Sequence, residues 1–337
     1  MAFQYLTNMP LDKAKSEYYA ALKESGFAAG TETVPTCEAA DRVTAKAVYA
    51  HISAPHYLAC AMDGIALRSE ATFGAGETSP VTLSATEYIP VDTGDPLPEG
   101  CDAVVMIEDV VRTEDGNVRL YDAAVPWQHI RQIGEDICAG EMILASHMRV
   151  TPAAIGAMLA AGVMQVEVLK RPVVAIIPTG DEIVAPSADP APGSVVEFNS
   201  SVFSSMIREW GADVNVYPIV PDDPKLLTQA MRKALAESDI VLLNAGSSAG
   251  RDDYSAQVIG ELGKVFCHGI AIKPGKPTIL GMIEGKVLMG IPGYPVSGIL
   301  VLTEILKPLL DEWFFKPLKE EKTAKAVLSR SVVSGLK

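Results

Sequence analysis

The second half of the chain alternates short apolar runs with helical segments, and this alternation constrains the fold more than any other feature. Unbroken apolar runs of strand length predict strands buried on both faces, as parallel strands are. Strands are predicted at 173–177, 214–219, 240–243, 278–280 and 287–291, and helices at 199–210 (with Asn199 as N-cap), 223–237, 253–262 and 295–310. This order predicts an α/β domain built on a doubly wound, mostly parallel sheet.

The first half has a different pattern. Apolar positions at helical spacing predict a helix over 11–25, and Thr36 is placed to cap a short helix over 37–42. From about residue 58 to 138, short apolar runs lie between Gly, Pro and Asp turns, which indicates a β-rich domain. Thr151 and Pro152 then begin a helix of small residues.

Four parts are therefore expected in this multidomain α/β protein. They are a discontinuous helical linker region (1–57 and 138–171), whose role in dimerisation is implied by the family resemblance given below, an inserted β-rich domain (58–137), the α/β domain (172–317), and a final segment (318–337) with a strand-like pattern at 322–333.

Composition excludes several classes of function. The formal net charge of −14 argues against nucleic acid as a partner, because phosphate backbones need a basic surface. The longest apolar segment, 299–310, contains Glu304 and Lys307, so no membrane span is expected. The N-terminus lacks the basic start and apolar core of a signal peptide. The five cysteines include no C-x-x-C pair, which favours a reducing cytoplasm.

The loop 244–254 directly follows the apolar run 240–243. A Gly/Ser loop at the carboxyl end of a parallel strand is where open α/β sheets bind ligands, and its N–H groups can bind an anion. Asp252 and Asp253 place two carboxylates beside it. This combination indicates a phosphorylated ligand with a divalent ion, or a charged substrate held by groups of both signs.

Further loops follow other predicted strands and are expected to meet at the same sheet edge. Taken alone, residues 179–182 (Thr-Gly-Asp-Glu) fit an ordinary turn and a ligand loop equally well. Residues 292–297 (Pro-Gly-Tyr-Pro-Val-Ser) would suit an anion at a helix N-terminus, although simple capping explains them better. Lys273 and Lys276 are more specific, because they add local positive charge to an acidic chain.

Taken together and in order, these segments resemble the molybdopterin molybdenumtransferase family, also called the MoeA/gephyrin E-domain family. The resemblance covers nearly the whole chain. The segments that carry it are 61–66 (Ala-Met-Asp-Gly-Ile-Ala), 93–100 (Thr-Gly-Asp-Pro-Leu-Pro-Glu-Gly), 134–136 (Gly-Glu-Asp), 178–182, 222–224, the loop ending in Asp253-Tyr254, 272–277 (Ile-Lys-Pro-Gly-Lys-Pro) and 292–297.

The resemblance implies a reaction in which adenylylated molybdopterin and molybdate give molybdenum cofactor and AMP, assisted by Mg²⁺. It also implies an elongated homodimer, in which the cleft lies between the α/β domain of one subunit and the β-rich domain of the other. A molybdopterin adenylyltransferase is a candidate partner.

The resemblance also implies site residues. The implied catalytic residues are Asp63, Thr93, Asp136, Glu182, Asp222, Asp253, Lys273 and Lys276. The implied ligand-binding residues are Thr179, Gly180, Asp181, Gly246, Ser247, Ser248, Gly250, Pro292, Gly293, Pro295 and Ser297. Glu182 and Asp253 are the expected metal ligands.

The chain departs from the family pattern in three places. Asn244-Ala-Gly246 stands where the family has Ser-Gly-Gly, Tyr294 stands where it has Asn, and Tyr57-Leu-Ala-Cys60 stands where it has Asp-Asn-Ser. Because a Cβ at Ala245 restricts the backbone, a carrier that binds the pterin without turnover stays an alternative. A molybdopterin adenylyltransferase is the other, although the long β-rich region argues against it.

The sequence does not separate molybdate from tungstate. Family members end with a small β-barrel, of which only the opening at 324–333 is present here, so we expect most of that barrel to be missing from this sequence.

Overall fold

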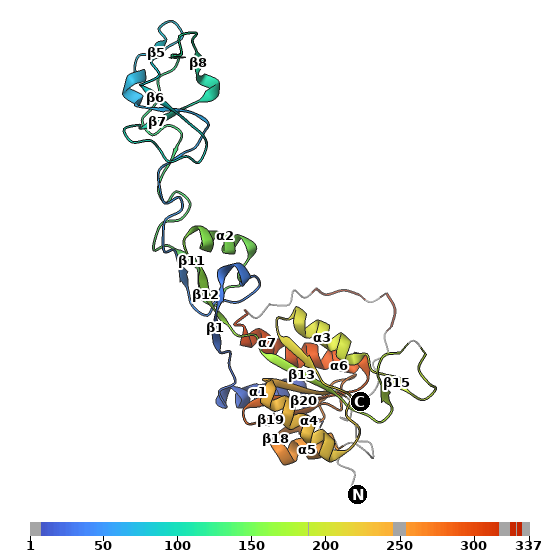
Figure 1. The fold of residues 1–337 in the computed structure, drawn as a ribbon. Helices are drawn as coiled ribbons and strands as arrows, with labels where there is room; N and C mark the ends of the chain where they lie inside the picture. The colour runs from blue at the N-terminus through green and yellow to red at the C-terminus, as the bar shows by residue number, and fades with distance from the viewer. Residues whose placement is uncertain (1–7, 188, 245–253, 317–323, 328, 332–337) are drawn as a thin grey trace. The chain divides into compact units, whose positions relative to one another are not determined.

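The computed structural model describes residues 8–187, 189–244, 254–316, 324–327 and 329–331. The chain divides into two compact units (Figure 1). Residues 1–29 and 171–337 form one, here called the α/β unit, and residues 30–170 form the other, here called the β-rich unit.

The α/β unit is built on a six-stranded sheet with the order β16-β13-β17-β20-β19-β18. Its strands are β13 (Val173–Pro178), β16 (Asp213–Val216), β17 (Ile240–Asn244), β18 (Lys264–His268), β19 (Ile279–Ile283) and β20 (Lys286–Ile291). The first four strands of that order are parallel, whereas β19 is antiparallel to both of its neighbours. The sheet is therefore mixed, with its predicted parallel part confirmed.

Two local features explain the antiparallel edge. Glu284 and Gly285 join β19 to β20 with φ values of 51° and 78°. A two-residue turn with both φ values positive reverses the chain into a hairpin. Strand β18, which the sequence pattern did not predict, then pairs with β19 and completes the edge.

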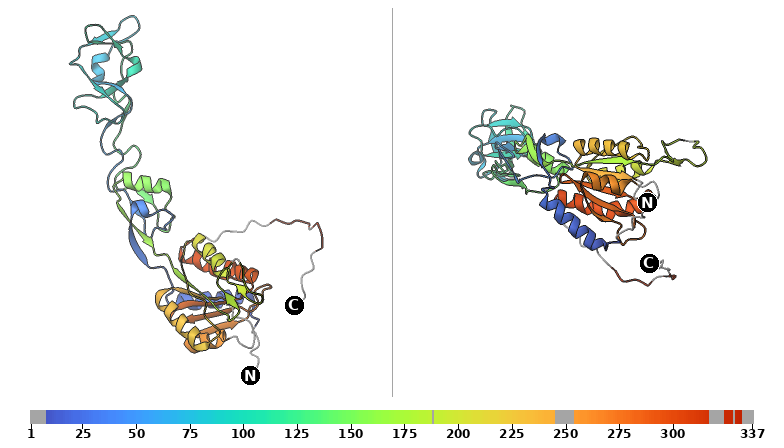
Figure 2. Two further views of the ribbon diagram at one scale, coloured as in Figure 1. Left: turned by 45° about the vertical axis from the view of Figure 1, so that its right-hand side comes forward. Right: turned by 90° about the horizontal axis from the view of Figure 1, so that it is seen from below.

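Helices cover both faces of this sheet (Figures 1 and 2). On one face pack α1 (Leu11–Glu24), α3 (Asn199–Glu209) and the continuous segment of α6 (Pro295–Val301), a π-helical turn (Leu302–Leu306) and α7 (Lys307–Trp313). On the other face pack α4 (Pro224–Glu237) and α5 (Ser255–Leu262). Along β13, Val174 and Ile176 face the first layer and Ala175 and Ile177 face the second. Burial on both faces explains why these strands are apolar throughout.

Helix α1 belongs to the α/β unit, although the sequence prediction grouped it with residues 138–171. Its stripe of Ala14, Tyr18 and Leu22 is buried in the core on the first face of the sheet. The Tyr18 hydroxyl donates to the carbonyl oxygens of Gly281 (2.8 Å) and Leu288 (3.2 Å). An apolar stripe of this width is stable only against another apolar surface, and the sheet supplies it.

The helix starts were predicted with mixed success. Asp223 caps α4 by accepting from the N–H groups of Lys225 and Leu226, and Thr151 caps α2 (Pro152–Ala160) through the N–H of Ala154. The predicted N-cap role of Asn199 is wrong, because its side chain bonds other loops while Glu197 accepts from the Ser200 N–H.

The short helix predicted over 37–42 is also wrong in extent. It is one 3₁₀ turn, η1 (Thr36–Glu38), whose Thr36 hydroxyl donates to the Val163 carbonyl instead of capping. Of the strand-like segment predicted at 322–333, the described residues form no strand, and the remainder lies outside them.

The β-rich unit is made of short antiparallel pairs. Two three-stranded sheets, β6-β4-β7 and β5-β9-β8, enclose a cluster that includes Leu67, Val105 and Leu120. Their strands are β4 (Gly64–Leu67), β5 (Val81–Leu83), β6 (Tyr88–Val91), β7 (Ala103–Met106), β8 (Val111–Arg112) and β9 (Val118–Leu120). A separate cluster contains Met158 of α2. Around it are the pairs β1 (Thr31–Pro35) with β12 (Gln165–Leu169) and β2 (Val48–Tyr49) with β11 (Met142–Leu144).

In the described part of the chain, every helix is too short or too polar to cross a membrane.

Candidate functional site

The order of the parallel strands creates a switch point in the α/β unit. From β13 the chain crosses to β16 on one side and then returns to β17 on the other. Loops that leave neighbouring strands in opposite directions open a crevice at their carboxyl ends, where open α/β sheets bind ligands. The register sets Pro178 opposite Asn244 and Asn244 opposite Ile291, so the loops after β13, β17 and β20 begin side by side. Their predicted convergence is confirmed.

Two aspartates of the predicted site hold the loops after β13 and β16 together. The N–H of Asp222 donates to Asp181 Oδ1 (3.1 Å), and the N–H of Asp181 donates to Asp222 Oδ2 (3.4 Å). Beside them, Gly180 has a φ of 139° and its missing Cβ would lie 2.7 Å from the Ile183 side chain. The turn therefore needs glycine, and it leaves the Glu182 carboxylate exposed at the sheet edge.

A small pocket of about 170 Å³ lies at the switch point. Of the predicted site residues, it is lined by Thr179, Glu182, Gly293 and Pro295. The other lining residues are Pro178, Ile183, Val195, Val196, Glu197, Phe198, Asn199 and Asn244.

Three side chains of this pocket form a network. Asn244 opens the loop 244–254 that was predicted to bind the ligand, whereas Glu197 and Asn199 were not predicted as site residues. Asn199 Nδ2 donates to the Gly293 carbonyl (2.9 Å) and to Asn244 Oδ1 (3.3 Å), and Asn244 Nδ2 contacts Glu197 Oε1 (3.5 Å). Asn199 begins α3, Asn244 ends β17, Glu197 lies two residues before α3, and the Gly293 carbonyl lies just after β20. Glu197 is brought to the pocket by the pairing of β14 (Ile183–Val184) with β15 (Val195–Val196). Because each of these strands has only two residues, the sequence gives little indication of the pairing.

Lys273 and Lys276 lie in the loop between β18 and β19. Because β18 runs parallel to β20 across the intervening β19, this loop leaves the sheet at the same edge as the other site loops. Backbone bonds hold it, including Ile270 N–H to the Lys276 carbonyl (2.9 Å). Both lysines are exposed, and neither forms an ion pair with any described residue. They share the edge but do not line the small pocket.

The remaining predicted residues of this unit divide into two groups. Pro292 is buried between β20 and α6, and Ser297 is buried in the first turn of α6. Tyr294, one of the departures from the family pattern, is 69% exposed. The predictions for Gly246, Ser247, Ser248, Gly250 and Asp253, and the departure at Ala245, fall outside the described residues.

In the β-rich unit, Asp63 and Thr93 are brought together across 30 residues of sequence. Asp63 Oδ1 accepts from the Thr93 N–H (2.6 Å) and hydroxyl (2.7 Å). Both bonds favour the ionised form, so they hold the pKa of the Asp63 carboxyl below its usual range. This carboxylate is exposed and anionic at neutral pH.

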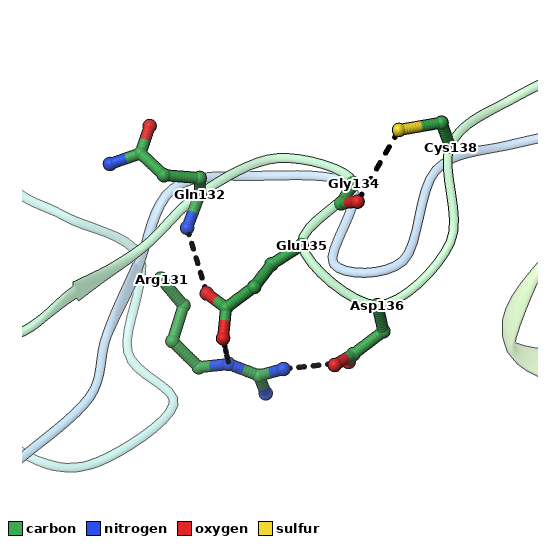
Figure 3. A network of polar contacts seen from close by, with 6 residues as sticks. All are labelled: Arg131, Gln132, Gly134, Glu135, Asp136 and Cys138. Atoms are coloured by element: carbon green, nitrogen blue, oxygen red, sulfur yellow. Dashed lines mark hydrogen bonds and ion pairs between the residues drawn. The ribbon is translucent and has the colours of Figure 1, made fainter.

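Asp136, in the same unit, is paired with a cation (Figure 3). The Arg131 guanidinium donates to Asp136 Oδ2 (2.6 Å) and lies 3.5 Å from Glu135 Oε1. The two carboxylates raise the pKa of Arg131. The turn needs glycine at position 134, where φ is 75° and a Cβ would lie 2.9 Å from Cys138 Sγ. The Gly134-Glu-Asp136 turn thus holds an arginine between two acids.

The carboxylates of the site are few, but a hard cation such as Mg²⁺ needs only one or two of them. The described residues contain no group of three or more His, Cys, Asp or Glu side chains arranged to hold a metal ion. Mg²⁺ keeps several waters and takes one or two protein carboxylates together with substrate phosphates, so the exposed Glu182 oxygens fit it without a larger cluster.

Comparison with known proteins identifies the family. Residues 9–162 match the MoeA N-terminal region (domain I and II), and residues 175–312 match a probable molybdopterin binding domain. A putative molybdopterin biosynthesis protein of Methanocaldococcus jannaschii is 31% identical over 306 residues, covering 86% of this chain and 76% of that protein. Molybdopterin molybdenumtransferase 2 of Mycobacterium tuberculosis is 31% identical over 326 residues, covering 90% of this chain and 80% of that protein.

The fold agrees with these matches. The crystal structure of a molybdopterin biosynthesis MoeA protein from Pyrococcus horikoshii superimposes with a TM-score of 0.77 at 33% identity, covering 92% of this chain and 81% of that one. The chain belongs to the MoeA-type molybdopterin molybdenumtransferases, a family of transferases of molybdenum cofactor biosynthesis.

Proposed function

We propose that this chain transfers molybdate into adenylylated molybdopterin, with Mg²⁺-assisted release of AMP, at the carboxyl edge of β13, β17 and β20. The observation that carries the proposal is the convergence of acidic loops and a lysine loop at one sheet edge. Such an edge offers both signs of charge, which a metal-assisted reaction on a phosphoanhydride and an oxyanion requires.

Each group has a chemical role in this proposal. Glu182, together with Asp253, would hold Mg²⁺, whose charge would stabilise the phosphate oxygens during cleavage. The Asp181–Asp222 pair fixes the two loops that present Glu182. Lys273 and Lys276 would balance the negative charge of phosphate and molybdate. Ser297, at the first turn of α6, would offer a hydroxyl.

A direct assay tests this proposal. Adenylylated molybdopterin, Mg²⁺ and molybdate are supplied together, and AMP is measured over time. AMP release that depends on molybdate and stops with a chelator is the expected result. Tight pterin binding without AMP under any metal or oxyanion would establish the carrier alternative. Formation of adenylylated molybdopterin from ATP would instead establish an adenylyltransferase. A parallel arm with tungstate addresses the choice of oxyanion.

We further propose a homodimer in which Asp63, Thr93 and Asp136 of one subunit complete the site of the other. Mixing two inactive variants tests this. In a mixture of Asp63→Asn and Lys276→Ala chains, half of the dimers are mixed and each carries one intact shared site, so about a quarter of wild-type activity returns. If each site lies within one chain, no mixed dimer has an intact site and no activity returns. A monomeric mass in light scattering would also end the proposal.

We infer a cytoplasmic enzyme that receives its substrate from a molybdopterin adenylyltransferase. The five cysteines are all free thiols, which suits a reducing compartment. Co-purification of the two enzymes at low salt would test the partnership, and a complex absent at micromolar concentration would contradict it.

A further inference from the structure

The small pocket at the switch point has an electrostatic character opposite to that of an anion site. Its lining includes two carboxylates, Glu182 and Glu197, and none of the described lining residues is Lys or Arg. Without a bound cation, a phosphate or molybdate would be repelled there. The volume of about 170 Å³ suits one ring system of a ligand better than a whole nucleotide.

The network in this pocket fixes which atoms face the ligand. A carboxylate only accepts hydrogen bonds, so Asn244 must turn Nδ2 toward Glu197 Oε1, as observed at 3.5 Å. Asn244 Oδ1 then faces Asn199, and Asn199 Nδ2 donates to it at 3.3 Å. The same Nδ2 also donates to the Gly293 carbonyl at 2.9 Å. Glu197 therefore orients the Asn244 amide, and Asn244 Oδ1 together with the Gly293 carbonyl orients the Asn199 amide.

This arrangement leaves acceptors without donors. Asn199 is only 8% exposed, and its Oδ1 has no hydrogen bond to any described residue. Glu197 uses Oε1 for the Ser200 N–H (2.9 Å) and for Asn244, and its Oε2 makes no hydrogen bond within the described residues. Buried polar atoms are almost always satisfied, and Asn199 is a residue of the pocket lining, so its orphaned acceptor indicates a ligand donor that reaches it from the pocket.

We propose that Glu197 and Asn199 bind the donor edge of the pterin, namely the amino group and adjacent ring N–H of its 2-amino-4-oxopyrimidine ring. This assignment rests on the proposed function for the identity of the ring. A carboxylate oxygen and an amide oxygen match two neighbouring N–H donors in geometry and sign. The phosphate and molybdate then lie outside this pocket, toward the lysine loop.

The test compares two small probes that differ at one group. Pterin carries the 2-amino donor, and lumazine carries a 2-oxo acceptor in its place. Binding is measured by fluorescence titration with the full chain, without nucleotide or metal. The wild-type protein should bind pterin more tightly than lumazine by on the order of a hundredfold, because the 2-oxo oxygen of lumazine would face the Glu197 carboxylate and neither can donate a hydrogen bond. Glu197→Gln should weaken pterin by on the order of tenfold or more and reduce the preference, since its amide can donate to the 2-oxo group.

Controls separate recognition from folding. Glu209→Gln makes the same change at an exposed position at the other end of α3 and should bind pterin as wild type does. Glu197→Gln keeps an acceptor for the Ser200 N–H, and circular dichroism checks that the helix content of the chain is unchanged. Asn244→Ser removes one of the two acceptors that orient Asn199 and leaves the Gly293 carbonyl, so it should lower pterin affinity less than Glu197→Gln does.

Equal binding of pterin and lumazine by wild type would overturn the proposal. So would unchanged pterin affinity in folded Glu197→Gln, or displacement of pterin by millimolar inorganic phosphate. Failure of AMP release with the pterin preference intact would reject the proposed reaction and leave this assignment standing.

Discussion

The two units of this chain hold their candidate residues in different ways. In the α/β unit, topology brings the loops together, because parallel strands end at one edge, and Glu182 has no side-chain partner among the described residues. In the β-rich unit, local hydrogen bonds set the positions of the carboxylates: Thr93 holds Asp63, and Arg131 holds Asp136.

This difference has a consequence for chemistry. Carboxylates already paired in their own unit are prepared for positioning and charge balance, whereas an unpaired one at a sheet edge is available to a metal or a substrate. The hydrophobic cores of the two units also differ. The sheet of the α/β unit is buried on both faces, and the β-rich unit has several small clusters between short strands. Its stability should therefore depend on close strand contacts.

The largest expected effect concerns such a contact. In Gly64→Ala the new Cβ would lie 2.0 Å from the Val105 carbonyl oxygen, which is backbone of the neighbouring strand. We expect a loss of about 3 kcal/mol or more in the free energy of unfolding. In Gly298→Ala of the α/β unit the Cβ meets the end of the Phe203 ring at 2.4 Å, and a ring can shift, so about 1–3 kcal/mol is expected.

Urea unfolding measures both variants. Gly156→Ala, on an exposed face of α2 with nothing within 4 Å, is the control and should gain about 0.5–1 kcal/mol. If Gly64→Ala and Gly298→Ala lowered the free energy of unfolding equally, a clash with backbone would be no more costly than a clash with a side chain, and the contrast between the two units would fail.

A smaller effect is expected from Tyr18→Phe, which tests whether α1 is part of the α/β unit. The change removes a buried hydroxyl that donates to two carbonyls, Gly281 and Leu288, and should cost about 1–3 kcal/mol. Tyr49→Phe, at a 52% exposed tyrosine of the β-rich unit, serves as control and should cost almost nothing. Thermal unfolding compares them. Equal melting temperatures for the two variants would show that α1 is not held by these bonds.

The smallest effect concerns pH and the β-rich unit. Because Thr93 lowers the folded-state pKa of Asp63, the resulting stabilisation is present above the unfolded value of about 3.9 and is lost as the pH falls through the folded value. Thr93→Val removes the hydroxyl donor and keeps the N–H, so the pKa of Asp63 should rise part of the way toward its ordinary value. Carboxyl NMR titration measures this.

The matched control is Thr113→Val, which removes the same kind of bond from Asp115. It should raise the pKa of Asp115 and leave that of Asp63 unchanged. A Thr93→Val protein with the wild-type Asp63 pKa would show that the backbone N–H alone sets it.

Much of the α/β fold was predictable, for a physical reason. Strands β13, β17 and β20 are buried on both faces, so each is an unbroken apolar run that sequence displays directly. Strand β18 begins with Lys264 straight after α5 and was missed. The direction of β19 was readable in principle from the Glu284-Gly285 turn, which only an antiparallel pair can use.

The site was predictable only in part. Convergence of the edge loops follows from strand order, so the sequence pattern was enough to group Glu182 with the lysines, and the family resemblance added Asp222. The contact of Asp63 with Thr93 depends on a tertiary pairing of β4 with β6, and only the family resemblance connected them. Glu197 could not be predicted as a site residue, because its position in the pocket depends on the pairing of β14 with β15. Strands of two residues are too short to show a periodic pattern in the sequence.

The central claim is that the carboxyl edge of the α/β sheet, with its lysine loop, performs the transfer. It is tested most directly by the rate of molybdate-dependent AMP release in Lys276→Ala against Lys23→Ala, which removes an exposed lysine from α1 of the same unit. Loss of a lysine that neutralises a reacting anion should slow release by on the order of a hundredfold, while Lys23→Ala stays at the wild-type rate. Equal rates for the two variants would contradict the claim.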